Sequence, residues 1–210
     1  MNISLNFLEM KNESLVGSNL DWIVDMVSSK GKETPQTIIF CKTFNIVSYV
    51  LSFLLVTLGG KAFVDADNQG KVSLIGVCHT KRWAKKKHHT EDMKRVLIAT
   101  CSQGVHIDCP DVRYVVQYTP PNSSFDMMQL ADLGGRDGLQ AHCIVYYTRQ
   151  QLSQCDKDVE NAVNCKDCQR KELYSYLSDS DSCSEPGHKC CSNCRKGCKC
   201  EGDKCGDKQP

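Results

Sequence analysis

The chain has 210 residues, 40% of them apolar, which suits one domain of ordinary size with a smaller appendage. Its formal net charge is only +1, so composition excludes a protein that binds nucleic acid through an overall basic surface. The N-terminus has no basic stretch followed by an apolar run, so we expect no signal peptide and a reducing compartment.

Helices and strands are expected to alternate along the first two thirds of the chain. Apolar spacing predicts a helix over 19–29, and Pro35 then separates it from a buried strand over 37–41. Further elements follow in chain order: a helix over 44–58, a strand over 72–77, a basic loop with a short helix over 80–94, strands over 95–100 and 112–118, a helix over 124–133 and a strand over 141–147. This alternation predicts an α/β fold, with a parallel sheet and helices on both faces.

One apolar run requires a choice between a core helix and a membrane span. Ile46 to Leu58 is 13 residues, and Gly59 and Gly60 end it. A membrane-spanning helix needs about 20 residues. We therefore interpret this run as a buried helix of a soluble domain and expect no membrane partner.

The C-terminal part has a different composition. Nine of the 15 cysteines lie between Cys165 and Cys205, among many Lys, Asp, Ser and Gly residues. Helices are expected over 151–163 and 169–177, and an acidic loop over 178–184. The cysteine-rich segment has too few apolar side chains to form a core of its own, and metal or cross-links must therefore hold it together. A reducing compartment favours metal, and free or disulfide-bonded cysteines are the alternative.

Two ordered motifs carry a family resemblance. Residues 95–113 read RVLIATCSQGVHIDCPDVR, and residues 128–138 read MQLADLGGRDG. The first resembles helicase motif V of the RecQ family, and the second resembles motif VI, Gln-Glu-x-Gly-Arg-Ala-Gly-Arg-Asp-Gly. TIIFCKT at 37–43 resembles motif IV, and His79 lies where the family has a histidine after a strand. The resemblance extends from about Asn2 to Cys205.

The resemblance implies a domain organisation and roles for individual residues. It predicts a RecA-like helicase C-terminal domain over 1–148, a helical zinc-binding module over 149–205 and a disordered tail over 206–210. In the family, ATP lies between two RecA-like domains, and motif VI arginine stabilises charge on the γ-phosphate. Arg136 and Gln129 match motif VI, and Asp108 and Thr100 match motif V, which couples the nucleotide to the bound strand. The alternatives are a turn role for Asp108 and a surface ion pair for Arg136.

The sequence also departs from the family. Asp132 and Leu133 replace a Gly-Arg pair of motif VI, so one arginine is missing, and Leu130 replaces the glutamate. No Gly-x-x-x-x-Gly-Lys-Ser/Thr loop and no Asp-Glu-x-His box occur in the sequence. ATP and Mg²⁺ are therefore expected only with a first RecA-like domain supplied, and the chain alone is expected neither to hydrolyse ATP nor to unwind DNA.

The cysteine-rich segment resembles the RecQ zinc module. A tetrahedral Zn²⁺ site needs four ligands at about 2.3 Å, and a two-residue spacer lets one turn supply two of them. Cys191 and Cys194 have that spacer, and Cys168 opens a helix as in the family. We predict Cys183 as the fourth ligand, with Cys190 as the alternate and His188 as a weaker candidate. Cys198, Cys200 and Cys205 are given no role.

A basic run supplies the candidate DNA contact. Residues 81–89 hold five Lys or Arg residues and Trp83, with Lys85, Lys86 and Lys87 in a row. Phosphate contacts with a stacking aromatic would use these residues, and a solvated loop or a nuclear-import signal is the alternative.

Taken together, the sequence predicts the C-terminal half of a nuclear, ATP-dependent 3′–5′ DNA helicase of the RecQ family. Its partners would be single-stranded or junction DNA and a first RecA-like domain. The second hypothesis is a non-catalytic module that binds DNA or protein, and the third, a metal-buffering protein, leaves the helicase motifs unexplained.

Overall fold

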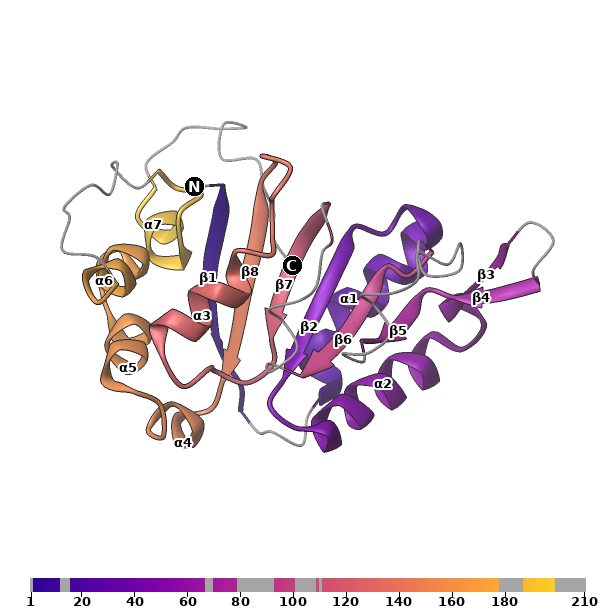
Figure 1. Cartoon of the computed structure of the whole chain (residues 1–210), viewed down its shortest axis with the longest axis horizontal. Coiled ribbons are helices and arrows are strands. Elements are labelled where there is room, and N and C mark those ends of the chain that lie inside the picture. Colours follow the sequence, from indigo (N-terminus) through magenta and orange to yellow (C-terminus); the bar gives the residue numbers. More distant parts are fainter. Residues whose placement is uncertain are drawn as a thin grey trace.

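A six-stranded parallel sheet forms the centre of the chain in the computed structural model (Figure 1). The structure describes residues 2–11, 16–66, 70–78, 93–100, 109, 111–177 and 187–198. The strand order is β1-β8-β7-β2-β6-β5. The strands are β1 (Ile3–Glu9), β2 (Gln36–Cys41), β5 (Ile75–Val77), β6 (Val96–Thr100), β7 (Val112–Gln117) and β8 (Ala141–Tyr147). The predicted α/β fold with a parallel sheet is confirmed.

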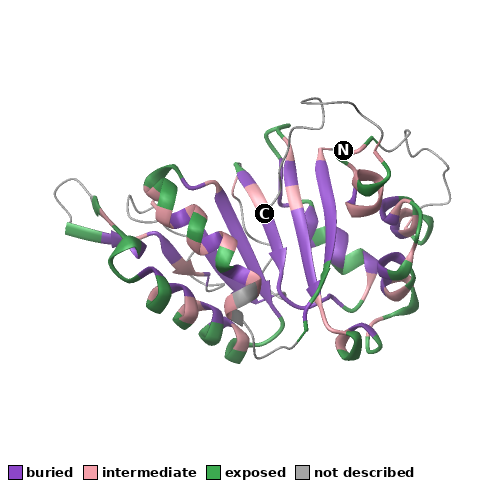
Figure 2. Cartoon of the chain, turned by 180° about the vertical axis from the view of Figure 1, so that it is seen from behind, coloured by how far each residue is buried: buried purple, intermediate pink, exposed green. Residues whose placement is uncertain are grey.

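Helices cover both faces of the sheet because alternate residues of each strand point to opposite sides. Ile39 and Cys41 of β2 pack in the cluster that includes α1 (Val16–Lys30) and α2 (Phe44–Leu58). Ile38 and Phe40 pack on the other face, with Leu130 of α3 (Ser124–Ala131). That face continues over β1 and β8 under α4 (Arg149–Leu152), α5 (Lys157–Asn164), α6 (Gln169–Ser175) and α7 (Ser192–Lys196). Every residue of β2 and β6 is buried, as Figure 2 shows.

Helix α2 lies against the sheet through one face only. The Thr43 side chain caps its N-terminus, and Val47, Val50, Leu54 and Leu58 are buried. The opposite face exposes Tyr49 and Val56, and α2 contains no charged residue. Among the described residues, the 19-residue segment Phe44–Ala62 is long and apolar enough to cross a membrane, by length and composition alone. Its contacts with β5 and β6 give α2 the place of a sheet-covering helix, buried on one face rather than all round.

The structure differs from the predicted elements at several places. Strand β1 is absent from the prediction, and it forms an edge of the sheet beside β8. The single strand expected over 72–77 is divided at Leu74 into β4 (Gly70–Ser73), which pairs with β3 (Phe63–Ala66) in a separate hairpin, and β5. The division arises because the Leu74 amide donates to the Ala62 carbonyl while the Leu74 carbonyl accepts from the Arg95 amide. The helix expected over 151–163 is two helices, α4 and α5.

Candidate nucleotide-facing turn and cysteine cluster

The turn after α3 presents Arg136 to solvent. We call residues 132–138 the motif VI turn. The Gly135 amide donates to the Val112 carbonyl at 3.0 Å, which fixes the turn at the amino end of β7. Gly135 has a φ of +66°, and a Cβ there would lie 2.7 Å from the Leu139 carbonyl oxygen. Glycine is therefore required by both backbone conformation and space. This turn carries Arg136, whose Nε donates to the Asp132 carbonyl at 3.2 Å.

An ion pair closes the same turn. Arg113 of β7 donates from its two terminal guanidinium nitrogens, Nη1 and Nη2, to the Asp137 carboxylate, and the Nη1–Oδ1 distance is 3.0 Å. This hydrogen bond raises the pKa of Arg113, and it lowers the pKa of Asp137. Asp137 also accepts from the Leu139 amide. The carboxylate next to Arg136 in sequence is thus held by Arg113.

The two leucines at departures from the RecQ pattern are core residues. Leu130 is 5% exposed and Leu133 is 3% exposed. Leu133, at the position of the missing arginine, belongs to the cluster with Val112 and Val115. The position therefore supplies apolar packing to the sheet instead of a charge to a nucleotide.

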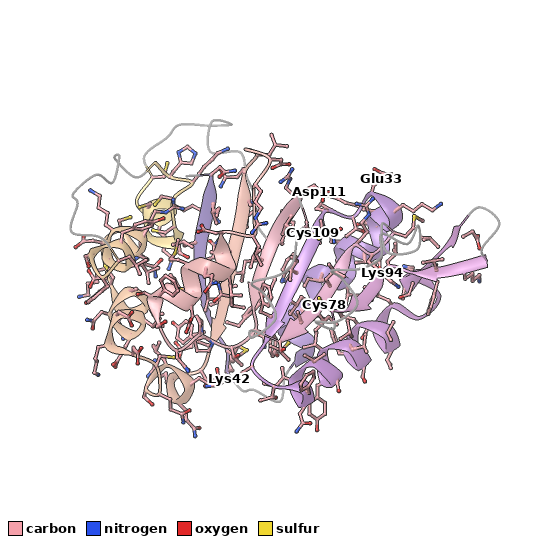
Figure 3. The ribbon with its side chains drawn as sticks, in the orientation of Figure 1. Glu33, Lys42, Cys78, Lys94, Cys109 and Asp111 are labelled. Atoms are coloured by element: carbon pink, nitrogen blue, oxygen red, sulfur yellow. The ribbon has the colours of Figure 1, made fainter. Side chains whose placement is uncertain are left out.

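The structure places only some of the predicted motor residues. Gln129 is exposed on α3, one turn before the motif VI turn. Thr100 is buried at the carboxyl end of β6, paired with Cys41. Arg136 lies at the amino ends of the strands, so a strand length of about 17 Å separates these two edges. Figure 3 shows the same two edges, marked by Lys42 at one and Asp111 at the other. His79, Lys85, Lys86, Lys87 and Asp108 lie outside the described residues.

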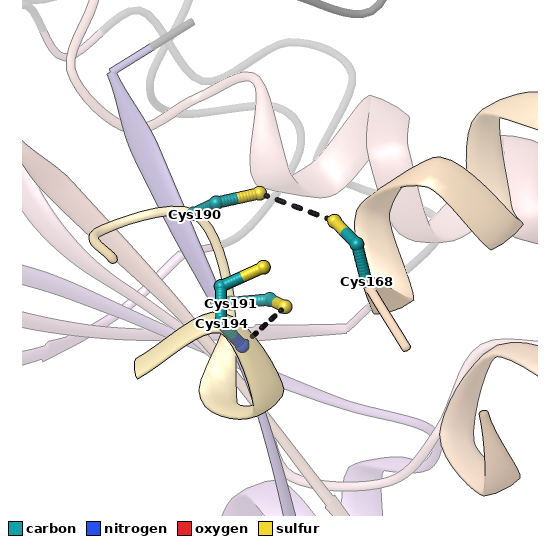
Figure 4. A group of neighbouring side chains, drawn as sticks. All are labelled: Cys168, Cys190, Cys191 and Cys194. Atoms are coloured by element: carbon teal, nitrogen blue, oxygen red, sulfur yellow. Dashed lines mark hydrogen bonds between the residues drawn. The ribbon is translucent and has the colours of Figure 1, made fainter. Parts of the chain in front are cut away.

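Four cysteines converge in the C-terminal part. The sulfur atoms of Cys168, Cys190, Cys191 and Cys194, here called the cysteine cluster, all lie within 4.8 Å of one another (Figure 4). The Cys168 and Cys190 sulfurs are 3.6 Å apart. Four sulfurs at about 2.3 Å from a tetrahedral metal ion would be about 3.8 Å apart, so this arrangement fits such an ion.

Local structure explains the convergence. Cys168 precedes α6, and Cys191 caps α7, where its sulfur accepts from the Cys194 amide at 3.5 Å. The Asn193 side chain joins the two parts, because its amide donates to the Cys165 and Asp167 carbonyls at 2.6 and 2.9 Å. The asparagine within the Cys-x-Asn-Cys sequence thus positions the turn that carries Cys168.

Proximity of the sulfurs changes their acidity. A hydrogen bond from the Cys190 thiol lowers the pKa of Cys191, and the same hydrogen bond raises the pKa of Cys190. Burial and the neighbouring sulfurs raise the pKa of Cys194. Several adjacent thiolates would repel one another in the absence of a cation. A bound divalent cation would favour the thiolate form of all four.

The cysteine cluster contains three of the four predicted ligands together with Cys190, the alternate. Cys183, the first choice for the fourth position, lies outside the described residues, as do Cys200 and Cys205. By sequence, Cys190 is the less favoured of the two because neighbouring residues converge on one ion less easily. A backbone bond from the Cys190 amide to the Gly187 carbonyl at 2.9 Å forms the turn that brings it inward.

Comparison with known proteins identifies the family of the part of the chain that forms most of the sheet. The family model described as "Helicase conserved C-terminal domain" matches residues 18–138, and the chain belongs to this family. Its relatives are RecQ-family helicases. The chain is 32% identical over 136 residues to the ATP-dependent helicase SGS1 of Saccharomyces cerevisiae, covering 54% of this chain and 9% of SGS1. It is 30% identical over 138 residues to the RecQ-like DNA helicase BLM of Xenopus laevis, covering 53% and 10%.

Solved structures support the fold. Domain 2 of the DEAD-box helicase Mss116p, bound to an RNA duplex, matches with a TM-score of 0.54 and 15% identity, over 79% of this chain and 61% of that one. A DEAD box protein of Methanococcus jannaschii matches with a TM-score of 0.52 and 23% identity, over 78% and 40%. The sheet is therefore RecA-like, as predicted. The chain spans about a tenth of SGS1 and of BLM, and the family match ends before the cysteine cluster.

Proposed function

We propose that the chain is the second half of an ATP-dependent 3′–5′ DNA helicase motor of the RecQ type. The observation that carries this proposal is an exposed arginine, Arg136, on a glycine turn fixed to the start of β7. In such motors an arginine from one RecA-like domain stabilises charge on ATP held by the other. Gln129 and Asp108 would complete the nucleotide-facing side, and Thr100 would couple it to the bound strand.

The nucleotide proposal is tested by supplying the first domain. The 210-residue chain is titrated into an isolated first RecA-like domain of a RecQ helicase, and ATP hydrolysis is followed with single-stranded DNA present. We expect no hydrolysis by the chain alone and a weak, DNA-dependent gain from the pair, which Arg136→Ala abolishes. A gain that Arg136→Ala leaves unchanged would reject this role. Lys171→Ala, an exposed cation elsewhere, is the matched control.

DNA is the proposed second partner. Several relatives are named DNA helicases, and the Mss116p domain was solved on an RNA duplex. Lys85, Lys86 and Lys87 supply the phosphate contacts in this proposal. The affinity for single-stranded DNA should fall with salt, and replacing any one of these lysines with glutamine should reduce the log–log slope by about 0.7. A slope near zero in the wild-type chain would remove DNA from the proposal.

The cysteine cluster is proposed to hold a structural Zn²⁺. Thiolate ligands at tetrahedral spacing suit this ion, which would fold the C-terminal part onto the sheet. Both possible ligand sets contain Cys168, Cys191 and Cys194, and the fourth ligand is either Cys183 or Cys190. Ser substitution of each separates them, because only the true ligand should lower Zn²⁺ affinity by several orders of magnitude. By its relatives' DNA-processing role, the chain would act in the nucleus in recombination, repair or replication.

A non-catalytic DNA- or protein-binding module is the second candidate. The buried Leu133 favours it, since the missing arginine's position is part of the core. The titration with a first RecA-like domain separates the two candidates. A non-catalytic module would bind single-stranded DNA with an affinity that falls with salt, yet it would give no gain in ATP hydrolysis.

A further inference from the structure

The edge strand β1 has backbone groups directed away from the sheet. Its inner side pairs with β8: the Asn2 carbonyl accepts from the Ala141 amide, and the Met10 amide donates to the Tyr147 carbonyl. In a parallel pair, residues of one parity face the neighbouring strand, so the backbone groups of Ile3, Leu5 and Phe7 face outward. Left uncovered, such an edge pairs readily with another strand.

The segment that carries Cys190, Cys191 and Ser192 covers these outward groups. The Leu5 amide donates to the Cys190 carbonyl at 2.9 Å, and the Phe7 amide donates to the Ser192 hydroxyl at 3.4 Å. Leu5 and Cys191 form a parallel bridge. Two members of the cysteine cluster therefore act as backbone partners of β1, whichever thiol completes the metal site.

The Arg170 side chain also links β1 to the turn that carries Cys190. It is only 8% exposed, and its guanidinium donates to the Ile3 carbonyl of β1 and, at 3.3 Å, to the Cys190 carbonyl. Arg170 lies in α6, two residues after Cys168. One buried cation thus links β1, the turn that carries Cys190 and the helix that follows Cys168.

The sequence of β1 has no feature that would prevent its uncovered edge from pairing with another strand. Ile3–Glu9 is seven residues long and has no proline, and its first six residues carry no charge. Uncharged segments of six or seven residues without proline favour edge-to-edge pairing when they are exposed at the edge of a sheet. Two copies of one edge can pair about a two-fold axis, because such an interface is self-complementary.

We propose that Arg170 and the cysteine cluster form a clasp over the outer edge of β1, and that a second copy of the chain pairs with this edge when the clasp opens. One arm of the test, chelation of the wild type, rests on the proposed metal binding, because removal of the metal would release the turn at Cys190. The contacts of Arg170 themselves need no metal. The latent surface is the backbone of Ile3, Leu5 and Phe7.

The test uses the full chain with Arg170→Met, which keeps the side chain's apolar length and removes its donors. Lys171→Met, the exposed neighbour on α6, is the matched control. Hydrogen exchange of the Leu5 and Phe7 amides should accelerate at least about tenfold in Arg170→Met and in chelator-treated wild type. Exchange in β2 and β6 should stay slow. Light scattering should then show concentration-dependent dimers in both samples and monomers in the control.

A second substitution separates edge pairing from general aggregation. Leu8 is a partly exposed residue of β1, so Leu8→Lys adds a charge to the edge without removing core packing. Combined with Arg170→Met, it should restore the monomer while exchange at Leu5 stays fast. Unchanged exchange and a monomeric state in Arg170→Met would overturn the clasp. If wild type binds no metal, the metal proposal fails, and Arg170→Met still tests the clasp.

Discussion

Replacing Leu133 with arginine, the residue that motif VI has at this position, should destabilise the chain. Leu133 is 3% exposed, so the substitution removes nearly its whole buried contribution, about 2 kcal/mol. The guanidinium would then lie among the buried apolar residues Val112, Val115 and Leu130. An unpaired buried charge adds several kcal/mol, reduced where the side chain reaches solvent. We expect the free energy of unfolding to fall by about 3–5 kcal/mol.

Urea unfolding of the purified chain, followed by circular dichroism, measures this loss. Leu139→Arg is the matched control, since Leu139 is 60% exposed six residues along the chain and should change stability by less than about 0.5 kcal/mol. Equal stability of Leu133→Arg and the wild type would refute the reasoning, because it would mean that the position opens to solvent. In that case a second arginine could face a nucleotide, and the non-catalytic alternative would lose its support.

Two further predictions concern the motif VI turn. Gly135→Ala should reduce the free energy of unfolding, measured in urea, by about 2 kcal/mol or more, because the new Cβ would lie 2.7 Å from a carbonyl oxygen in a left-handed backbone conformation. Gly138→Ala is the control: Gly138 has a φ of +85° and open space around it, so the substitution should reduce the free energy of unfolding by only about 1 kcal/mol. Equal losses in the two variants would contradict the steric argument. The pKa of Asp137 is lowered by Arg113, so its contribution to stability is present above the unfolded-state pKa and disappears as pH falls through the folded pKa. Acid titration of Asp137→Asn should therefore show a shallower loss of stability below about pH 4 than the wild type, and identical curves would exclude the ion pair from acid unfolding.

The sequence predicts the central strands because burial on both faces leaves a direct signal. β2 and β6 each contain four consecutive apolar residues, 38–41 and 96–99, and fully buried parallel strands have such runs. The prediction lacks β1 although its sequence offers a weaker signal: Ile3, Leu5 and Phe7 alternate with Ser4 and Asn6. Alternation indicates a strand with one polar face, whereas here both polar residues are buried as well.

Other features depend on contacts between distant residues. The division at Leu74 arises from backbone bonds to Ala62 and Arg95, and no local pattern of side chains records such partners. The same applies to the cysteine cluster. Spacing indicates Cys191 and Cys194, but the inward position of Cys190 depends on a turn that pairs with β1. Sequence patterns report burial and local turns, and they do not report which distant segments meet.

Metal analysis of the purified 210-residue chain tests the proposed assembly of sheet and cysteine cluster most directly. Native mass spectrometry should find one Zn²⁺ per chain, and Cys168→Ser should lose the ion and unfold the C-terminal part while residues 1–148 keep their sheet. A chain that is folded from β1 through α7 and contains no metal, with amide exchange at Leu5 unaffected by chelator, would contradict it.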